Sequence, residues 1–326
     1  MKKIIFCALH AFIFSACSPK MYEKTSDGES FETLTQITDS DKPSLYPNGG
    51  DLGENLVFAS REEDASYNIY MKEKVLTKAI IQKTAGKNLH LNPSYCSANN
   101  RIVFQTFDKT NFDIYYIDAS KGKAITQVTN TDDEDEYNPS WSSDGNLIIF
   151  ERGATPKTYA MINQKTNKPA GGVSVKKNQI WIKDLKTKEL KMIGEGSFPK
   201  FSSDSKNIAF VKYDLDKSKS KETGTIWIMS TEGDSPRQIT DVNLGYATNP
   251  NWSPDGKNII FQLTKKNKQD SDIYVIDTNG ENLRQYTLNK SSDFAPYWSV
   301  DDFIYFSSDR GAKASKYQVW RFKIKK

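Results

Sequence analysis

Short apolar runs separated by polar turns fill the chain, and one pattern of this kind recurs along it. In each copy a proline and an aromatic or leucine residue enter a first run, a polar turn follows, and a second run ends on phenylalanine. Runs of this length bounded by turn residues predict pairs of antiparallel strands. The copies occupy residues 42–58, 92–104, 138–150, 198–210, 249–261 and 295–306.

The prolines set the period of the repeat, because they stand 46 to 60 positions apart. We assign each to the first position of an inner strand, where a missing N–H is tolerated. The aromatic residues of the pattern are expected to fill the space between neighbouring repeats rather than to bind a ligand. The assigned prolines are Pro43, Pro93, Pro139, Pro199, Pro250 and Pro296.

Each copy is followed by two further strand signals. The third strand is marked by a β-branched residue and then an aromatic one, as in Ile69-Tyr70 and Val319-Trp320, and the fourth by weaker runs such as 235–240. Four short strands in each period of about 40–50 residues are typical of propeller blades. A parallel β-helix has shorter repeats, and βαβ repeats need helical stretches that are absent here. The sequence therefore predicts an all-β fold, a six-bladed β-propeller with four-stranded blades.

The two ends of this repeat region complement each other. After residues 318–326 no fourth strand follows in the last blade, whereas residues 33–38, "TLTQIT", precede the first copy and resemble a fourth strand. An N-terminal outer strand added to the last blade would close the ring and remove an exposed strand edge. One propeller domain over residues 33–326 is expected.

The stretch "NPNWSPDGKNIIF", residues 249–261, and the run that follows it resemble the repeat of the TolB-like (WD40-like, PD40) β-propellers. The likeness extends over residues 33–326. It implies the propeller fold and an envelope-associated, non-enzymatic role in protein binding, with an envelope protein or a peptidoglycan-associated protein as partner. The separate α/β domain of that family is not expected, because only residues 18–32 separate the ring from the N-terminal signal.

Residues 1–16 are typical of a secretory signal peptide, with Lys2 and Lys3 before a short apolar run. The run ends on "FSAC", which resembles a bacterial lipobox and predicts lipidation of Cys17. An ordinary signal peptide cut nearby is the alternative. We expect residues 17–32 to be a polar tether and the lipid anchor to be the only membrane attachment. Ser18 after the cysteine favours the outer membrane by the same resemblance.

Composition narrows the functional classes. The chain has 45 basic and 41 acidic residues, a balance that gives no support to nucleic-acid binding. Once Cys7 leaves with the signal and Cys17 takes lipid, Cys96 has no partner, so no internal disulfide is expected. Cys96 is instead expected to be a small buried apolar residue. We expect a monomer.

Motifs for common chemistries are missing from the sequence. There is no G-x-S-x-G elbow and no P-loop, and His90 is the one histidine after the signal. A metal centre built from several imidazoles cannot be assembled from one histidine. We therefore expect no enzymatic activity, no cofactor and no metal. A glycan-binding or glycan-active propeller that holds a saccharide through carboxylates is the alternative.

Two charged segments accompany the third blade. The first is a run of five acids, which is either a solvated loop, a contact for a basic partner or a weak Ca²⁺ site. The second is a long loop, residues 153–177, with five lysines and no acid. We expect the two segments to attract each other and to contribute to partner binding. The residues in question are Asp132, Asp133, Glu134, Asp135 and Glu136 in the run and Lys165, Lys168 and Lys176 in the loop.

A third group of candidates surrounds the prolines. Asn92, Asn138 and Asn249 directly precede a proline, and we expect them to line the central funnel. An asparagine there either braces its own turn or contributes to a polar mouth for a peptide or sugar. His90, Glu136 and Asp293 stand three positions before their prolines and are expected in the same funnel.

Overall fold

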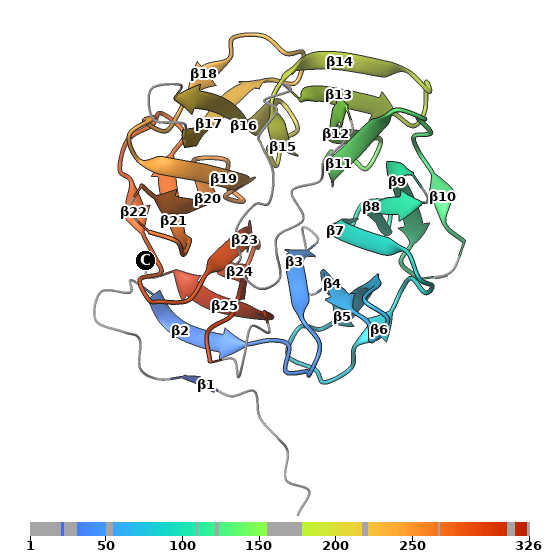
Figure 1. Ribbon diagram of the computed structural model, residues 1–326, viewed down its shortest axis with the longest axis horizontal. Coiled ribbons are helices and arrows are strands. Elements are labelled where there is room, and N and C mark those ends of the chain that lie inside the picture. Colours follow the sequence, from blue (N-terminus) through green and yellow to red (C-terminus); the bar gives the residue numbers. More distant parts are fainter. Residues whose placement is uncertain are drawn as a thin grey trace, which may run out of the picture.

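The computed structural model (Figure 1) describes residues 21–22, 31–49, 55–108, 110–120, 124–154, 178–216, 221–266, 268–311 and 317–324. All regular elements in these residues are β-strands, so the predicted all-β class is confirmed. Twenty-four of the 25 described strands fall into six groups of four, which surround a common axis (Figure 1). We call these groups blades 1 to 6, in the order of their first strands.

The strands of each blade run antiparallel from the axis outwards. The innermost strands are β3 (Ser44–Gly49), β7 (Leu89–Cys96), β11 (Glu134–Trp141), β15 (Ser197–Phe201), β19 (Gly245–Trp252) and β23 (Asp293–Trp298). The second strands are β4 (Asn55–Arg61), β8 (Arg101–Asp108), β12 (Leu147–Ala154), β16 (Asn207–Asp216), β20 (Asn258–Lys265) and β24 (Phe303–Ser308).

The outer half of each blade follows the same order. The third strands are β5 (Tyr67–Glu73), β9 (Asn111–Asp118), β13 (Gln179–Asp184), β17 (Lys221–Ser230), β21 (Asp272–Asp277) and β25 (Gln318–Ile324). The fourth strands are β6 (Ile81–Gln82), β10 (Thr126–Gln127), β14 (Leu190–Glu195), β18 (Arg237–Gln238), β22 (Arg284–Gln285) and, in blade 6, β2 (Phe31–Gln36).

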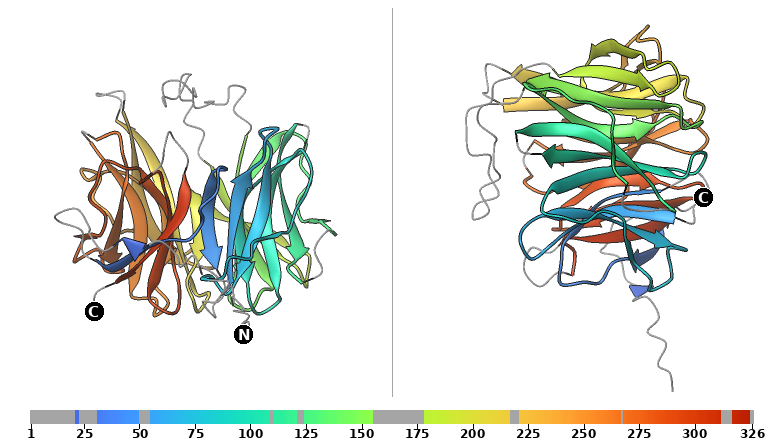
Figure 2. Two further views of the ribbon diagram at one scale, coloured as in Figure 1. Left: turned by 90° about the horizontal axis from the view of Figure 1, so that it is seen from below. Right: turned by 90° about the vertical axis from the view of Figure 1, so that its right-hand side faces the viewer.

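Blade 6 is built from both ends of the described chain. β2 pairs antiparallel with β25, placing Leu34 opposite Phe322. Thr38 continues this contact, because its Oγ1 accepts a hydrogen bond of 2.9 Å from the Val319 N–H. The side views show β2 beside β25 (Figure 2). The segment that the sequence assigns to the closing strand, residues 33–38, therefore lies where it was expected.

The expected tether is in part a strand. Met21–Tyr22 form β1, which pairs antiparallel with β2 on its outer edge. The segment that contains Cys17 lies outside the described residues. The two paired residues of the expected tether are therefore held against blade 6.

The core lies between the blades, as the repeat predicts. The phenylalanines that end the second runs are at most 1% exposed, namely Phe58, Phe104, Phe150, Phe210, Phe261 and Phe306. Indoles join neighbouring blades: Trp141 Nε1 donates to the Ser94 carbonyl at 3.1 Å, and Trp252 Nε1 donates to the Lys200 carbonyl at 3.0 Å. Cys96 is buried, as expected.

Five of the six assigned prolines do not start their strands. They lie inside an innermost strand, directly after a residue with positive φ, and the two residues form a β-bulge that shifts the register by one position, as Tyr46 and Pro47 do in β3. A bulge leaves a residue out of the hydrogen-bond ladder, so the missing N–H of proline costs nothing there. The positive-φ residues are Tyr46, Asn92, Asn138, Phe198, Asn249 and Ala295, with φ between 49° and 57°.

The first copy of the repeat is displaced from its predicted register. The bulge of β3 lies between Leu45 and Asn48, so Pro47 and not Pro43 occupies the repeated position. Pro43 precedes the strand instead. The assignment of Leu45 as a counterpart of the aromatic residues was therefore wrong by four positions.

Candidate functional site

Two cavities lie on the axis, and both are lined by innermost strands. The larger cavity has a volume of about 390 Å³ and extends to the turns between first and second strands, where Ser143, Ser203 and Pro254 line it. The smaller cavity, of about 40 Å³, lies beside the bulges. Asn48, Lys200 and Asn251 line both, so the two cavities adjoin each other along the axis.

The smaller cavity is lined by the bulge residues, among them Asn92, Asn138 and Asn249. Their amides do not brace their own backbone. Asn138 Nδ2 donates to Glu151 at 2.8 Å, and Asn249 Nδ2 donates to Gln262 at 2.8 Å. Both acceptors lie on the second strands, so these asparagines hold an innermost strand against its neighbour within the blade.

The same second-strand side chains also reach the next blade. Glu151 accepts a hydrogen bond from the Phe198 backbone N–H at 2.8 Å, and Gln262 accepts one from the Ala295 N–H at 3.1 Å. Since each bulge exposes a backbone N–H toward the preceding blade, one side chain joins two blades. The bulge amides thus have mainly a structural role.

The larger cavity is surrounded by the residues that directly follow the prolines. These are Asn48, Ser94, Ser140, Lys200, Asn251 and Tyr297. Five of the six are neutral hydrogen-bonding residues, and the sixth is a lysine. Among the described residues that line the two cavities there is no carboxylate and no imidazole.

Lys200 is the charged group of this site. Burial within the ring lowers the pKa of its amine to about 8, and the carboxyl of Glu151 opposes that shift. Burial in turn raises the pKa of Glu151, whose oxygens are occupied by Asn138 and the Phe198 N–H. Among the described residues no salt bridge joins the Lys200 amine to an acid.

Sequence reasoning did not find Lys200. In the aligned copies it stands directly after a proline, where serine, asparagine or tyrosine stand elsewhere. That substitution was visible in the sequence, but with the prolines assigned to strand starts, the following position was not recognised as facing the axis. The bulge is what turns it there.

His90, Glu136 and Asp293 do not line the cavities, so that expectation was wrong. Their exposed fractions are 2%, 0% and 0%. Glu136 and Asp293 face the preceding blade, through Thr129 and Ser271, whereas His90 packs within its own blade. His90 Nδ1 lies 2.9 Å from Thr106 Oγ1, and its ring packs edge-on against Phe104.

The acidic run is only partly solvated. Asp132 and Asp133 are exposed, whereas Glu134 starts β11 and the next two acids are buried. Asp135 accepts a hydrogen bond from the Phe112 N–H at 2.8 Å. Contact of Asp135 and Glu136 with a basic partner is therefore excluded by their burial, because the strand has already placed them inside the blade interface.

Glu136 belongs to a charged cluster between blades 2 and 3. It accepts a hydrogen bond of 2.9 Å from Arg152 Nε and one of 3.1 Å from Thr129 Oγ1. Burial raises the pKa of Glu136 to about 8, and a hydrogen bond with the Asp113 carboxyl adds to the effect, while Arg152 opposes it. Two buried carboxyls facing one guanidinium are balanced in charge when they share one proton.

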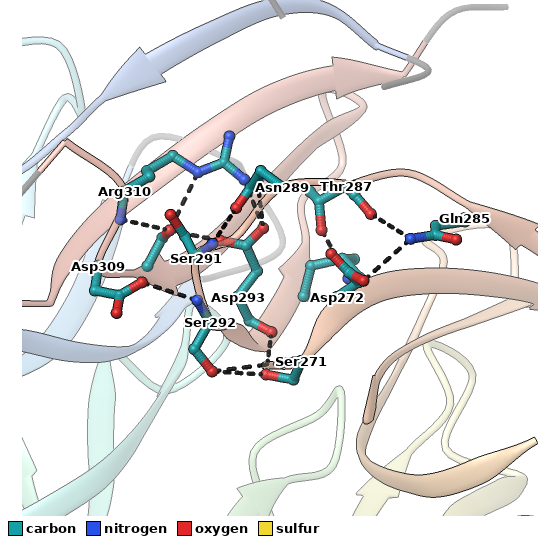
Figure 3. A network of polar contacts seen from close by, with 12 residues as sticks. Ser271, Asp272, Gln285, Thr287, Asn289, Ser291, Ser292, Asp293, Asp309 and Arg310 are labelled. Atoms are coloured by element: carbon teal, nitrogen blue, oxygen red, sulfur yellow. Dashed lines mark hydrogen bonds and ion pairs between the residues drawn. The ribbon is translucent and has the colours of Figure 1, made fainter. Parts of the chain in front are cut away.

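A similar cluster joins blades 5 and 6 (Figure 3). Asp293 accepts hydrogen bonds from Ser308 and Arg310, and the Ser271 hydroxyl donates to its backbone carbonyl at 2.8 Å. Burial raises the pKa of Asp293 and raises that of the nearby Asp272 to about 6. Both clusters occupy the same place in the repeat, so their acids fix neighbouring blades to each other.

Replacing Glu136 by glutamine should flatten the dependence of stability on pH. An acid whose pKa is raised by folding contributes its stability fully below its unfolded pKa of 4.5, and loses it as pH rises through about 8. In the unchanged protein we expect the free energy of unfolding to fall over pH 5–8, with a share from Glu136 that approaches about 1.4 kcal/mol per pH unit.

Urea denaturation at several pH values measures this effect. The Glu134→Gln variant is the control, because Glu134 lies 3.6 Å from the same guanidinium and is half-exposed. It should keep the slope of the unchanged protein. Equal slopes for Glu136→Gln and the unchanged protein would contradict the shared proton.

The remaining predicted sites lie outside the described residues: Cys17, Lys165, Lys168 and Lys176. Where the chain is described, no three or more Asp, Glu, His or Cys side chains are grouped to hold a metal ion. A helix long and apolar enough for a membrane span is likewise not found in that part of the chain.

Comparison with known proteins gives one family match. Residues 196–325 match PD40, the TolB beta propeller domain. The Tol-Pal system protein TolB of Francisella tularensis subsp. holarctica (strain OSU18) is 25% identical over 288 residues, which cover 87% of this chain and 58% of that protein. The chain thus spans less than two thirds of the length of these curated relatives.

Solved structures share the fold. TolB from Acinetobacter baumannii superposes with a TM-score of 0.61 at 16% identity, over 84% of this chain and 64% of that one. An oligogalacturonate lyase in complex with manganese superposes with a TM-score of 0.60 at 14% identity, over 95% and 97%. Because TolB and a lyase both appear at this level of identity, these structures establish the architecture and leave the activity to the site.

Proposed function

Because this chain is a TolB-like β-propeller, we propose that it is a non-enzymatic, protein-binding scaffold of the bacterial cell envelope. The observation that carries the proposal is the placement of the acids. Glu136, Asp293 and Asp272 are buried in the contacts between blades, and the described lining of the axial cavities offers no acid–base pair. A rigid ring whose buried acids hold the blades together is suited to presenting loops for protein binding.

The envelope assignment is supported by the relatives and by the N-terminal signal. The curated relatives are described as Tol-Pal system proteins. We propose that Cys17 is lipidated and holds the ring on the outer membrane through its acyl chains. The partner is an envelope protein or a peptidoglycan-associated protein, and the ring acts as a monomer.

We place the partner contact on the rim beside blade 3. Asp132 and Asp133 remain exposed in the connection between β10 and β11, and the long lysine-bearing loop follows β12 of the same blade. Exposed charges at an interface give selectivity and fast association more than raw affinity. The buried pair Asp135 and Glu136 supports this segment from inside.

Crosslinking and pull-down from detergent-solubilised envelopes test the proposal. The full chain is expected to recover one stoichiometric protein partner, and the double change Asp132→Lys and Asp133→Lys is expected to reduce the recovery several-fold at low salt. Glu232→Lys is the matched control, since Glu232 is an exposed acid of another blade.

Two outcomes count against the proposal. One is the absence of any stoichiometric protein partner, and the other is unchanged recovery after the changes at Asp132 and Asp133. Reversal of Lys165, Lys168 and Lys176 to glutamate separates the two rim segments: loss of partner in this variant alone would place the contact on the loop and away from the acids.

The geometry does not favour a saccharide held by Glu136 and Asp293. Both are fully buried, and their oxygens already accept hydrogen bonds from arginine and hydroxyl groups. A sugar could reach them only if the blades separated. Any glycan chemistry of this protein must therefore use other residues.

A further inference from the structure

We propose that the larger axial cavity is a binding site for a small organic anion that carries one carboxylate beside hydroxyl groups, with Lys200 as its cationic contact. The inference is independent of the protein partner on the rim. It begins with the position of Lys200, which directly follows Pro199 and lines both axial cavities.

The fold itself does not require a lysine at this position. Serine occupies the equivalent place in blades 2 and 3 and asparagine in blades 1 and 5, and their strands contain the same bulge. The contact of this residue with the next blade is made by its backbone carbonyl, which accepts the hydrogen bond from Trp252 Nε1. The amine contributes nothing to that contact, so a neutral residue would serve the ring equally well.

The amine is also held at a cost in stability. Burial lowers its pKa to about 8, which means that folding disfavours the charged form. The acid that opposes this effect, Glu151, has both oxygens engaged with blade 3 and blade 4. A partly buried cation that makes no salt bridge is a local conflict in the sequence, and such conflicts are expected at functional sites.

The surroundings define the ligand. One cation calls for one negative charge, and the side chains around it are neutral: Asn48, Asn251, Ser94 and Ser140 donate and accept hydrogen bonds, as hydroxyl groups require. A volume of about 390 Å³ lies in the range of small-ligand sites. A multiply charged phosphate would leave charge uncompensated, whereas a hydroxy carboxylate matches both groups of residues.

A second polar group of the lining also lacks a partner. Trp298 Nε1 is buried and makes no hydrogen bond, although Trp141 and Trp252 at the equivalent positions each donate to the preceding blade. Trp298 Nε1 has no exposed surface and is therefore closed off from the cavity, so the ligand is defined by Lys200 and its neutral neighbours.

Two sources supply this chemistry, a free hydroxy acid and the terminal acidic residue of an oligosaccharide. Calorimetric titration of the full chain with D-gluconate, D-glucuronate and a glucuronate-terminated disaccharide distinguishes them, with D-glucose as the neutral control. We expect the acids to bind and glucose not to bind. Tighter binding of the disaccharide than of both monomers would identify the oligosaccharide as the source.

The variant Lys200→Met tests the contact. It should weaken binding of the acids on the order of tenfold or more, because a charge-assisted hydrogen bond is lost. Removing a partly buried charge that makes no salt bridge should leave the fold at least as stable. Lys206→Met is the control, since Lys206 is exposed in the same blade and should have no effect.

A second measurement does not depend on the variant. Acetylation of the unchanged protein at pH 8, read by mass spectrometry, should modify Lys200 in the free protein and be slowed several-fold by a saturating acid. Binding should also weaken above pH 8, where the amine loses its proton. Equal binding of glucose and glucuronate, unchanged binding by Lys200→Met, or acetylation unaffected by the acids would overturn the proposal, as would protection by peptides with a free C-terminus alone.

Discussion

Replacement of Phe322 by alanine is expected to lower the free energy of unfolding by about 3–5 kcal/mol, the usual cost of emptying a fully buried phenylalanine site. Phe322 has no exposed surface. Its ring stacks on Phe31 of β2 at 4.7 Å and lies 5.9 Å from Tyr286 and 5.6 Å from Phe306. One side chain thus joins β2, blade 5 and the second strand of blade 6.

Urea denaturation measures this loss, and amide hydrogen exchange localises it. The amides of Leu34 and Gln36 should exchange faster in the variant than those of β8, because the contact between β2 and β25 is weakened first. Leu76→Ala is the control: Leu76 is 56% exposed, so the change should stay within about 0.5 kcal/mol. A loss below about 1 kcal/mol for Phe322→Ala would contradict the packing described here.

Replacement of Arg152 by methionine is expected to cost about 3–5 kcal/mol at pH 8, since it leaves buried carboxyls without their cation. The Arg152 side chain is nearly buried, its Nε lies 2.9 Å from Glu136, and its guanidinium covers the Trp181 ring at 4.6 Å. Methionine keeps most of the volume. The loss is therefore expected to come mainly from the electrostatic change.

The dependence on pH separates charge from packing. At pH 5 Glu136, whose pKa burial raises to about 8, binds its proton more completely, so the loss in Arg152→Met should be clearly smaller than at pH 8. Arg284→Met is the control, because the pair of Arg284 with Asp277 is half-exposed and is worth about 0–1 kcal/mol. Equal losses at both pH values would show that packing and not charge dominates at Arg152.

Much of the architecture could be predicted from the sequence because the same strand pattern occurs six times. Pairs such as Ile69-Tyr70 and Val319-Trp320 fall in third strands, and the strand signal of residues 33–38 falls beside β25. Errors arose where a local signal was ambiguous. Pro43 and Pro47 are four residues apart, and what distinguishes them is the positive φ of Tyr46, whose N–H donates to Ser307 of the preceding blade.

The site was less predictable because its determinants are distant in the sequence. The burial of Glu136 depends on Arg152, sixteen positions away, and on Asp113 of the preceding blade. Five adjacent acids alone indicate a solvated loop. Lys200 looks like any other lysine until the bulge directs it to the axis. The periodicity of the sequence therefore predicts the structural positions that all blades share. It does not predict the role of residues such as Lys200 that occur in one blade only.

The pairing of β2 with β25 also determines when blade 6 can form during synthesis of the chain. Thr35 and its partner Arg321 are separated by almost the whole described chain. A ribosome that adds about 5–20 residues per second needs tens of seconds to travel that distance. During this interval β2 has no partner in β25, and its open edge can pair with other extended segments. The time for which this edge stays open is therefore set by the synthesis of β25, and slower translation should increase aggregation of the unfinished chain.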